Sequence, residues 1–266
     1  MNNIFDIKRF GQYFLYDLRR AKNNYGLSLL LMGLIPIILY IVGQLISLIG
    51  GNGIMEMPDV MKIMGIYIVL VVVLLGAGTK IYGFVTEKRA GSDFLMLPAS
   101  TFEKWLSMVL MVCIALPVVL FALLFVSDGL MSLVFPHSYG GRIFNLDLIS
   151  GFINAFEEEG VSFNLPAFTV INWCENILIF TLGAICFKRG KVGKTILCLM
   201  GLATVISTLL VIIFGTGNID TDRFIDFFDT PEKAVSVFNW SFSIAYTIIF
   251  GLLLGGMYYR LRTIKQ

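Results

Sequence analysis

The chain of 266 residues is poor in charge. Asp, Glu, Lys and Arg together make up 14% of it, whereas 57% is hydrophobic. A soluble domain typically carries about 25% charged and about 45–50% apolar residues. Apolar runs of roughly 20 residues recur along the chain, which is the length that crosses a hydrocarbon core of about 30 Å. The composition therefore excludes an ordinary soluble domain and predicts an integral membrane protein.

Histidine is almost absent as well, since His137 is the only one. A metal site of the H-E-x-x-H type and a Ser-His-Asp arrangement therefore have no support in the sequence. The segment 190–195 resembles a phosphate-binding loop, but Lys188 stands where its first glycine is needed and an apolar span precedes it in place of a strand. We predict no enzymatic activity, no cofactor, no metal and no nucleic-acid partner.

Paired cysteines are also missing, because no C-x-x-C motif occurs. The four cysteines fall within apolar runs or at their edges. We interpret them as small buried apolar residues rather than as a disulfide or metal framework. They are Cys113, Cys174, Cys186 and Cys198.

The long apolar runs predict an all-α, polytopic membrane protein with six transmembrane helices in a single domain, 1–266. Pro36 and Pro117 fall inside two of the spans, where neighbouring helices can satisfy the carbonyl that proline leaves free. The predicted spans are 27–49, 63–81, 105–126, 165–187, 195–215 and 237–259.

The N-terminal segment 4–22 predicts an amphipathic helix that lies in the plane of the membrane surface. Its apolar residues recur every three or four positions, and basic residues lie between and after them. Such a helix places its aromatic rings at headgroup level and its bases toward anionic lipid. A basic flank that only fixes orientation is the alternative interpretation. The apolar positions are Ile7, Phe10, Phe14 and Leu18.

Lysine and arginine are distributed unevenly about the predicted spans. Sixteen of the 20 fall in the N-terminal segment, the second and fourth connections and the C-terminal tail. The positive-inside rule then places both termini in the cytoplasm, as an even number of spans also requires. The four on the other side are Lys62, Arg142, Arg223 and Lys233.

The segment 80–105 is a polar island between the second and third spans. Ser100 and Glu103 have the spacing of a capping box, in which the serine accepts from the N–H three residues on and the glutamate reaches back. A helix should therefore begin near Thr101 and continue into the apolar run. The connection also carries a patch of mixed charge between two rigid spans, which could dock a partner or be an ordinary solvated turn. Its charged residues include Glu87, Lys88, Arg89, Asp93, Glu103 and Lys104.

Glu175 is an acidic residue well inside a predicted span, with Asn172 and Asn176 close by in sequence. A charge at the bilayer centre costs roughly 2.5–3.5 kcal/mol on insertion scales, so Glu175 should face protein or water. It is either part of a substrate or proton path, or an interhelical hydrogen-bonding residue.

The order of these elements resembles ABC transporter permeases of the type-2 exporter class. In addition, Leu97-Pro98-Ala99-Ser100 followed by Glu103-Lys104, after the segment Phe84–Arg89, is similar to a loop in small bacterial permease-like membrane proteins of that group. The resemblance implies a homodimer or heterodimer in the bacterial inner membrane, driven by a separate ABC ATPase subunit. It also implies that the loop 83–104 carries a coupling helix that docks on the ATPase.

Two further helices are expected outside the six spans. The spacing of apolar residues over 146–156 favours a short helix on the external surface. The resemblance implies a re-entrant helix within 216–236, although five acidic residues there oppose deep insertion. Two other functions remain open: a membrane protein without transport activity, such as an assembly factor or sensor, and an ATPase-independent carrier that uses Glu175.

Overall fold

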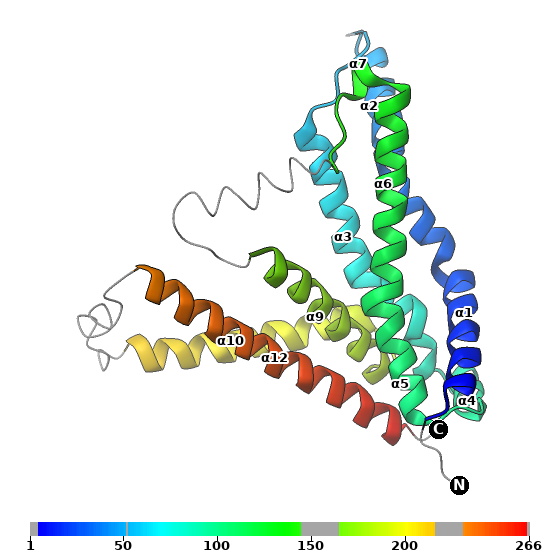
Figure 1. Cartoon of the computed structure of the whole chain (residues 1–266), viewed down its shortest axis with the longest axis vertical. Coiled ribbons are helices and arrows are strands. Elements are labelled where there is room, and N and C mark those ends of the chain that lie inside the picture. The colour runs from blue at the N-terminus through cyan, green and yellow to red at the C-terminus, as the bar shows by residue number, and fades with distance from the viewer. Residues whose placement is uncertain (1–4, 52, 145–164, 216–230, 265–266) are drawn as a thin grey trace.

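The computed structural model describes residues 5–51, 53–144, 165–215 and 231–264, and this part of the chain is all-α (Figure 1). Two elements are not α-helices: η1 is a 3₁₀ turn, and η2 is a π-helix. In chain order the elements are α1 (Ile7–Gly33), α2 (Ile35–Ile49), α3 (Asp59–Tyr82), η1 (Gly83–Thr86), α4 (Lys88–Met96), α5 (Thr101–Leu110), η2 (Met111–Ala115), α6 (Leu116–Val134), α7 (Pro136–Tyr139), α9 (Leu165–Cys186), α10 (Lys191–Gly215) and α12 (Pro231–Thr263).

Helices α1, α2, α3 and α6 form an elongated bundle that runs the length of the molecule (Figure 1). Its core consists of aliphatic side chains on α3 and α6 that are almost fully buried, among them Val73, Ala77, Leu120 and Leu124. Helix α9 packs against α3 from the other side. The lower end of the bundle therefore brings together segments that are far apart in sequence.

The N-terminal half of the chain differs from the prediction at its first connection. A helix over 4–22 and a separate span over 27–49 were expected, but α1 continues without a break to Gly33. The break comes at Leu34, and α1 and α2 are bent by 49° there. Pro36 lies in the first turn of α2, where its missing N–H costs nothing, whereas inside a helix its ring would clash with an earlier carbonyl. The proline thus sets the boundary.

The buried face of α1 also differs from the expected one. Tyr13, Asp17 and Tyr25 are buried, whereas Ile7 is 75% exposed and Leu18 is 39% exposed. The spacing of three and four residues was correct, but the stripe that faces the bundle is shifted. One consequence is that an acidic side chain lies on the packed face.

Close helix packing between α3 and α9 depends on a glycine. A Cβ at Gly78 would lie 2.8 Å from the backbone of Thr181, which is too close for any other residue. Small residues allow such approaches between helices in membranes. Gly78 therefore fixes the distance between the bundle and α9.

The predicted third span is interrupted by η2. The π-helical turn separates the polar start of this span in α5 from the apolar α6, with Pro117 in the first turn of α6. Prolines and π-bulges are established causes of irregularity within helices. The span was predicted over 105–126, and the helical segment extends from Thr101 to Val134.

The described residues contain four helices long and apolar enough to cross a membrane, and the bent pair α1–α2 adds a fifth. The four are Asp59–Thr86, Thr101–Val134, Lys191–Ile212 and Asn239–Thr263. Within α9 the apolar stretch Ile171–Cys186 is shorter. The protein is therefore a polytopic all-α membrane protein, and the count of six spans stays a prediction.

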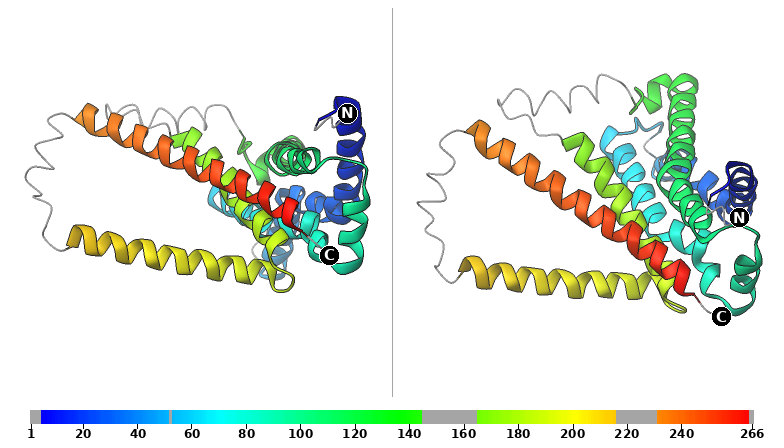
Figure 2. Two further views of the ribbon diagram at one scale, coloured as in Figure 1. Left: turned by 90° about the horizontal axis from the view of Figure 1, so that it is seen from below. Right: turned by 60° about the horizontal axis from the view of Figure 1, so that its bottom comes forward.

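Helices α10 and α12 diverge from the bundle (Figure 2). In each of these helices only 6% of the most apolar 18-residue stretch is buried. Cys198 on α10 is exposed and the other three cysteines are only partly buried, so the prediction of buried cysteines is wrong for Cys198; all four are free thiols. The helix expected over 146–156 lies outside the described residues, as does the part 216–230 of the segment in which a re-entrant helix was expected.

The end of the bundle remote from the termini is closed by a buried carboxylate. Asp128, 1% exposed, accepts hydrogen bonds from the hydroxyl of Tyr139 (2.7 Å) and from the backbone N–H of Ile143 (2.9 Å). The Lys62 ammonium lies 4.5 Å from the centre of the Tyr139 ring and donates to Asp59 (2.7 Å). These contacts fasten α7 and the chain after it to α3 and α6.

Candidate functional site

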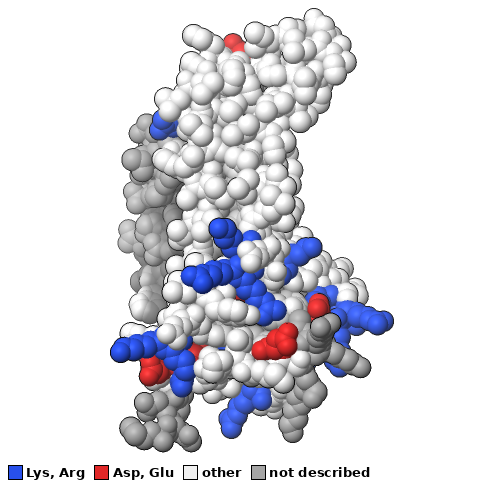
Figure 3. Space-filling model, turned by 90° about the vertical axis from the view of Figure 1, so that its right-hand side faces the viewer, with Lys and Arg blue, Asp and Glu red and all other residues white. Residues whose placement is uncertain are grey.

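The basic segments of the chain meet at one end of the molecule. The start of α1, the helix α4 and the end of α12 lie together at the lower end in Figure 1. Figure 3 shows Lys and Arg side chains gathered over the lower half of the right-hand side of the molecule, while the upper half is almost free of charge. This distribution agrees with the uneven one read from the sequence.

Hydrogen bonds connect these basic segments. Thr86 in η1 donates to the carbonyl of Phe187 (3.4 Å), and the ammonium of Lys191 donates to the carbonyl of Gly83. Arg260 near the end of α12 donates to the carbonyl of Ile185 (3.3 Å). The connection after α3, the α9–α10 turn and the C-terminal helix are thus one assembly at this end, which we call the basic end.

Helix α4 lies within the loop 83–104, where the resemblance implied a helix between the second and third spans. Phe94 is 3% exposed and packs edge-on against Phe84, with ring centres 6.0 Å apart. On the opposite side of the helix Asp93 is exposed and Met96 is 82% exposed. One face of α4 is therefore fixed to the protein, and the other is accessible to a partner.

The capping box is confirmed at the start of α5. The Glu103 N–H donates to the Ser100 hydroxyl (3.2 Å), and the Ser100 N–H donates to the Glu103 carboxylate (2.8 Å). The helix begins at Thr101, as expected. Ser100 and Glu103 thus have a structural role in starting this helix.

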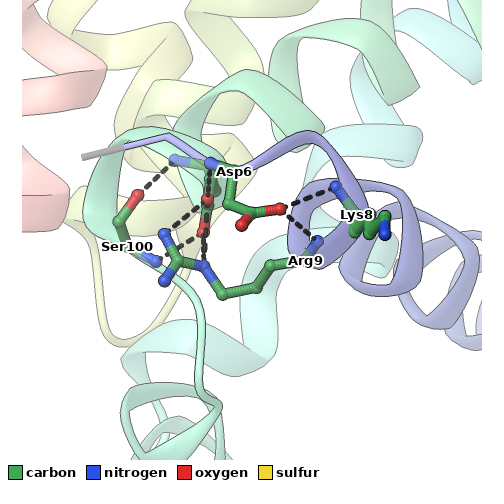
Figure 4. Close-up of polar contacts among 5 residues, drawn as sticks. Asp6, Lys8, Arg9 and Ser100 are labelled. Atoms are coloured by element: carbon green, nitrogen blue, oxygen red, sulfur yellow. Dashed lines mark hydrogen bonds and ion pairs between the residues drawn. The ribbon is translucent and has the colours of Figure 1, made fainter. Parts of the chain in front are cut away.

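Glu103 has a second partner that the local pattern did not predict. The Arg9 guanidinium on α1 binds its carboxylate, with a shortest N–O distance of 2.7 Å, and the Asp6 N–H adds a bond of 2.9 Å. Figure 4 shows Asp6, Arg9 and Ser100 converging at this point. Asp6 also caps α1 by accepting from Lys8 and Arg9. We call Asp6, Arg9, Ser100 and Glu103 the N-terminal clasp.

The charge of Glu103 is stabilised within this clasp. Burial acts to raise the pKa of its carboxyl, but the hydrogen bonds from Arg9, Asp6 and Ser100 outweigh burial and lower the pKa from 4.5 to about 2. Glu103 is therefore ionised throughout the physiological range. It is fully buried, so it does not belong to an exposed docking patch.

Lys104 is also turned inward, which differs from the expected exposed patch. Its ammonium donates to the carbonyl of Phe94 (2.7 Å) and lies 4.9 Å from the centre of that ring. The side chain is 6% exposed. Lys104 supports α4 from behind, and its charge is not available to a partner.

The remaining residues of the predicted docking patch lie on or beside α4. Glu87 is the N-cap residue and is exposed, and its carbonyl accepts from the N–H of Gly91. Lys88 and Arg89 form the first two positions of α4, and their side chains lie outside the described ones. The accessible part of the patch is therefore α4 itself, with Asp93 and Met96.

A buried polar cluster behind the clasp was missed from the sequence. Asp17 on α1 is 3% exposed and accepts from the hydroxyls of Tyr82 and Ser107, both at 2.7 Å. These contacts join α1, α3 and α5. A usable signal existed, because Asp17 follows Phe14 by three residues and so lies on the apolar side of the helix.

Glu175 is buried in α9, as expected for a carboxylate inside a span, and is 4% exposed. Its Oε1 accepts no hydrogen bond from the described residues. Asn176 instead donates to Asn172, which is exposed, at 2.7 Å. The two asparagines therefore bond to each other, and the structure does not join them to Glu175.

The chain was compared with protein-family models, curated proteins and solved structures, and none of them matches it.

Proposed function

We propose that the chain is the membrane-spanning permease subunit of an ABC-type exporter, coupled to a separate ATPase subunit through the loop 83–104. In this proposal both termini are in the cytoplasm of a bacterial cell, and the chain pairs with a second permease, identical or related. The observation that carries it is the construction of α4, a short helix accessible on one side and fixed on the other.

The contacts on the buried face of α4 suit this helix to transmit a force to the rest of the protein. Lys104 at the start of α5 holds the last turn of α4, and Phe84 after α3 packs on the same Phe94 ring. The guanidinium of Arg20 on α1 lies 3.3 Å from the centre of the Phe84 ring. A force on α4 therefore acts on three helices together, as a rigid-body mechanism requires.

The experiment is co-purification of the tagged chain from native membranes, with its partner identified by mass spectrometry. We expect a protein that carries a G-x-x-x-x-G-K-[ST] nucleotide-binding loop. The double variant Asp93→Lys with Met96→Glu should lose this partner, because both side chains are exposed on α4. Joint reconstitution in vesicles should then give ATP-dependent flux.

The matched control is Glu56→Lys, an exposed carboxylate at the opposite end of the bundle. This variant should retain the partner. Variants at Glu103 or Lys104 are unsuitable because both side chains are buried and their loss would disturb the fold. Recovery of no ATPase, or unchanged recovery with the α4 double variant, would refute the proposal.

Glu175 favours a second candidate, a carrier that needs no ATPase. A buried carboxylate with an unpartnered oxygen, 4% exposed, is suited to exchange a proton or bind a cation. This candidate predicts pH-gradient-driven flux in vesicles that contain the chain alone, abolished by Glu175→Gln. The exposed Asn172→Asp is its control. Full flux and pH response in Glu175→Gln would exclude it.

A further inference from the structure

A groove of about 380 Å³ runs along the bundle between α1 and the η2–α6 segment. Its walls are almost entirely aliphatic and aromatic, with Lys22 as the cation that lines it. This volume is in the range of sites for small apolar ligands, roughly 300–1,000 Å³. Its α1 wall includes Leu18, Lys22, Gly26 and Leu30, and its α6 wall includes Val119 and Leu123.

The groove has the length of one leaflet of a bilayer. Its α1 wall extends from Leu18 to Leu30, and at about 1.5 Å per residue this is roughly 18 Å. Half of a hydrocarbon core of about 30 Å is roughly 15 Å. A single extended acyl chain therefore fits along it, from the polar interface to the middle of the membrane.

The charge at the groove is concentrated near one end. Lys22 is exposed at the wall nearer the basic end, and Arg19, one turn earlier on α1, is also exposed. The nearest acidic residue on α1, Asp17, is buried and accepts from Tyr82 and Ser107. It is thus turned away from the groove and leaves the two cations free to meet an anion at headgroup level.

We propose that this groove binds one acyl chain of an anionic phospholipid, whose phosphate is held by Lys22 and Arg19. Charge complementarity at one end and an apolar channel of one-leaflet length together select this occupant. The site is separate from α4 and from any ATPase, so the proposal stands or falls independently of the function proposed above.

The headgroup is tested with the full-length chain in detergent, offered equal amounts of dioleoyl phosphatidylglycerol and dioleoyl phosphatidylcholine. Native mass spectrometry measures which lipid is retained. We expect the chain to retain more phosphatidylglycerol than phosphatidylcholine, and each of the two cations should raise this ratio by about fivefold. Lys22→Gln should reduce this ratio by about fivefold, whereas Lys8→Gln, an exposed lysine on the same helix outside the groove, should leave it unchanged.

The acyl chain is tested by filling the groove. Val119→Trp places a large ring in the groove, and Val118→Trp places the same ring on the neighbouring position, which is 62% exposed and does not line it. Val119→Trp should lose the retained phosphatidylglycerol, and Val118→Trp should keep it. Circular dichroism establishes that both variants are folded, and Lys22→Gln provides an independent variant that changes no packed group.

The outcomes separate the alternatives. Equal retention of both lipids by the wild type, or an unchanged ratio in Lys22→Gln, overturns the proposal. If Val119→Trp retains as much phosphatidylglycerol as Val118→Trp, the lipid lies on the surface and the groove is not its site. Inorganic phosphate should not displace the lipid at equal concentration, and if it does, the site recognises free phosphate instead.

Discussion

The two ends of the bundle are each closed by a buried carboxylate, and the two carboxylates are held in opposite ways. At the basic end Glu103 binds the guanidinium of Arg9 and two backbone N–H groups. At the other end Asp128 accepts from a tyrosine hydroxyl and from backbone N–H groups. Both are at most 1% exposed.

The difference lies in the access of their partners to water. The Arg9 side chain is 38% exposed, whereas Tyr139 is completely buried. A donor that can be hydrated loses little when its acceptor is removed, but a buried donor retains the full cost of desolvation. The burial of the partners, rather than the formal charge of the pair, should therefore decide how much each carboxylate stabilises the fold.

The largest effect is expected for Asp128→Ala. Removal of this carboxylate leaves the Tyr139 hydroxyl and the Ile143 N–H without their acceptor inside the protein. We expect the free energy of unfolding to fall by about 3 kcal/mol, measured by denaturant titration in mixed micelles. The double variant with Tyr139→Phe removes the main buried donor and should recover part of this loss. No recovery would show that the hydroxyl is not the costly group.

Glu103→Ala should have a smaller effect, about 2 kcal/mol, because its main donor returns to water. It also removes half of the capping box, so the first turn of α5 should exchange its amide hydrogens faster. Ser100→Ala is the comparison, since it removes the cap and leaves the contact with Arg9. A loss in Glu103→Ala greater than in Asp128→Ala would contradict the account based on access to water.

Arg9→Gln tests the charge of the clasp through its pH dependence. The pKa of Glu103 is lowered to about 2, so its contribution is fully present above its ordinary pKa of 4.5 and is lost as the pH falls toward 2. Hydrogen exchange in the first turns of α1 should therefore reflect a constant stability between pH 8 and 5. In Arg9→Gln the pKa of Glu103 should move back toward 4.5, so protection should fall by less than in the wild type as the pH decreases from 5 to 2. An equally large fall in both proteins would remove Arg9 as the cause.

Asp59→Ala should have the smallest effect. The Asp59 side chain is 78% exposed, and Lys62 keeps a hydrogen bond to the carbonyl of Gly141 (3.3 Å) and its position over Tyr139. The Lys62 ammonium is buried, but it keeps these two contacts when the exposed carboxylate is removed, so we expect a loss of about 1 kcal/mol in the same titration. A loss comparable to that of Asp128→Ala would mean that Asp59 holds Lys62 in place.

Much of the fold could be predicted because its signals are local. The capping box of Ser100 and Glu103 indicated the start of α5 at the correct residue, since both partners lie within four positions. The helix between the second and third spans was likewise implied by the resemblance. Pro36 was noted, but its effect depends on neighbours: in a span it can be tolerated, and here it ends one helix and begins another.

The candidate site was less predictable because its contacts are non-local. Arg9 and Glu103 are 94 residues apart, and no spacing rule relates them. Lys104 looked like a free surface charge because a lysine next to a glutamate usually is one, yet it folds back on Phe94. The groove beside α1 arises only after α1 continues past residue 22 and packs beside α6.

The π-helix η2 has a consequence for the register of the third span. A π-turn accommodates about one residue more than an α-turn, and one residue turns an α-helix by about 100°. This extra residue sets the angular phase between the faces of α5 and α6. It lets Glu103 and Trp105 face Arg9 and α12 while Leu120 and Leu124 face the core. The span therefore consists of two helical segments whose packed faces point in different directions, and η2 fixes the rotation between them.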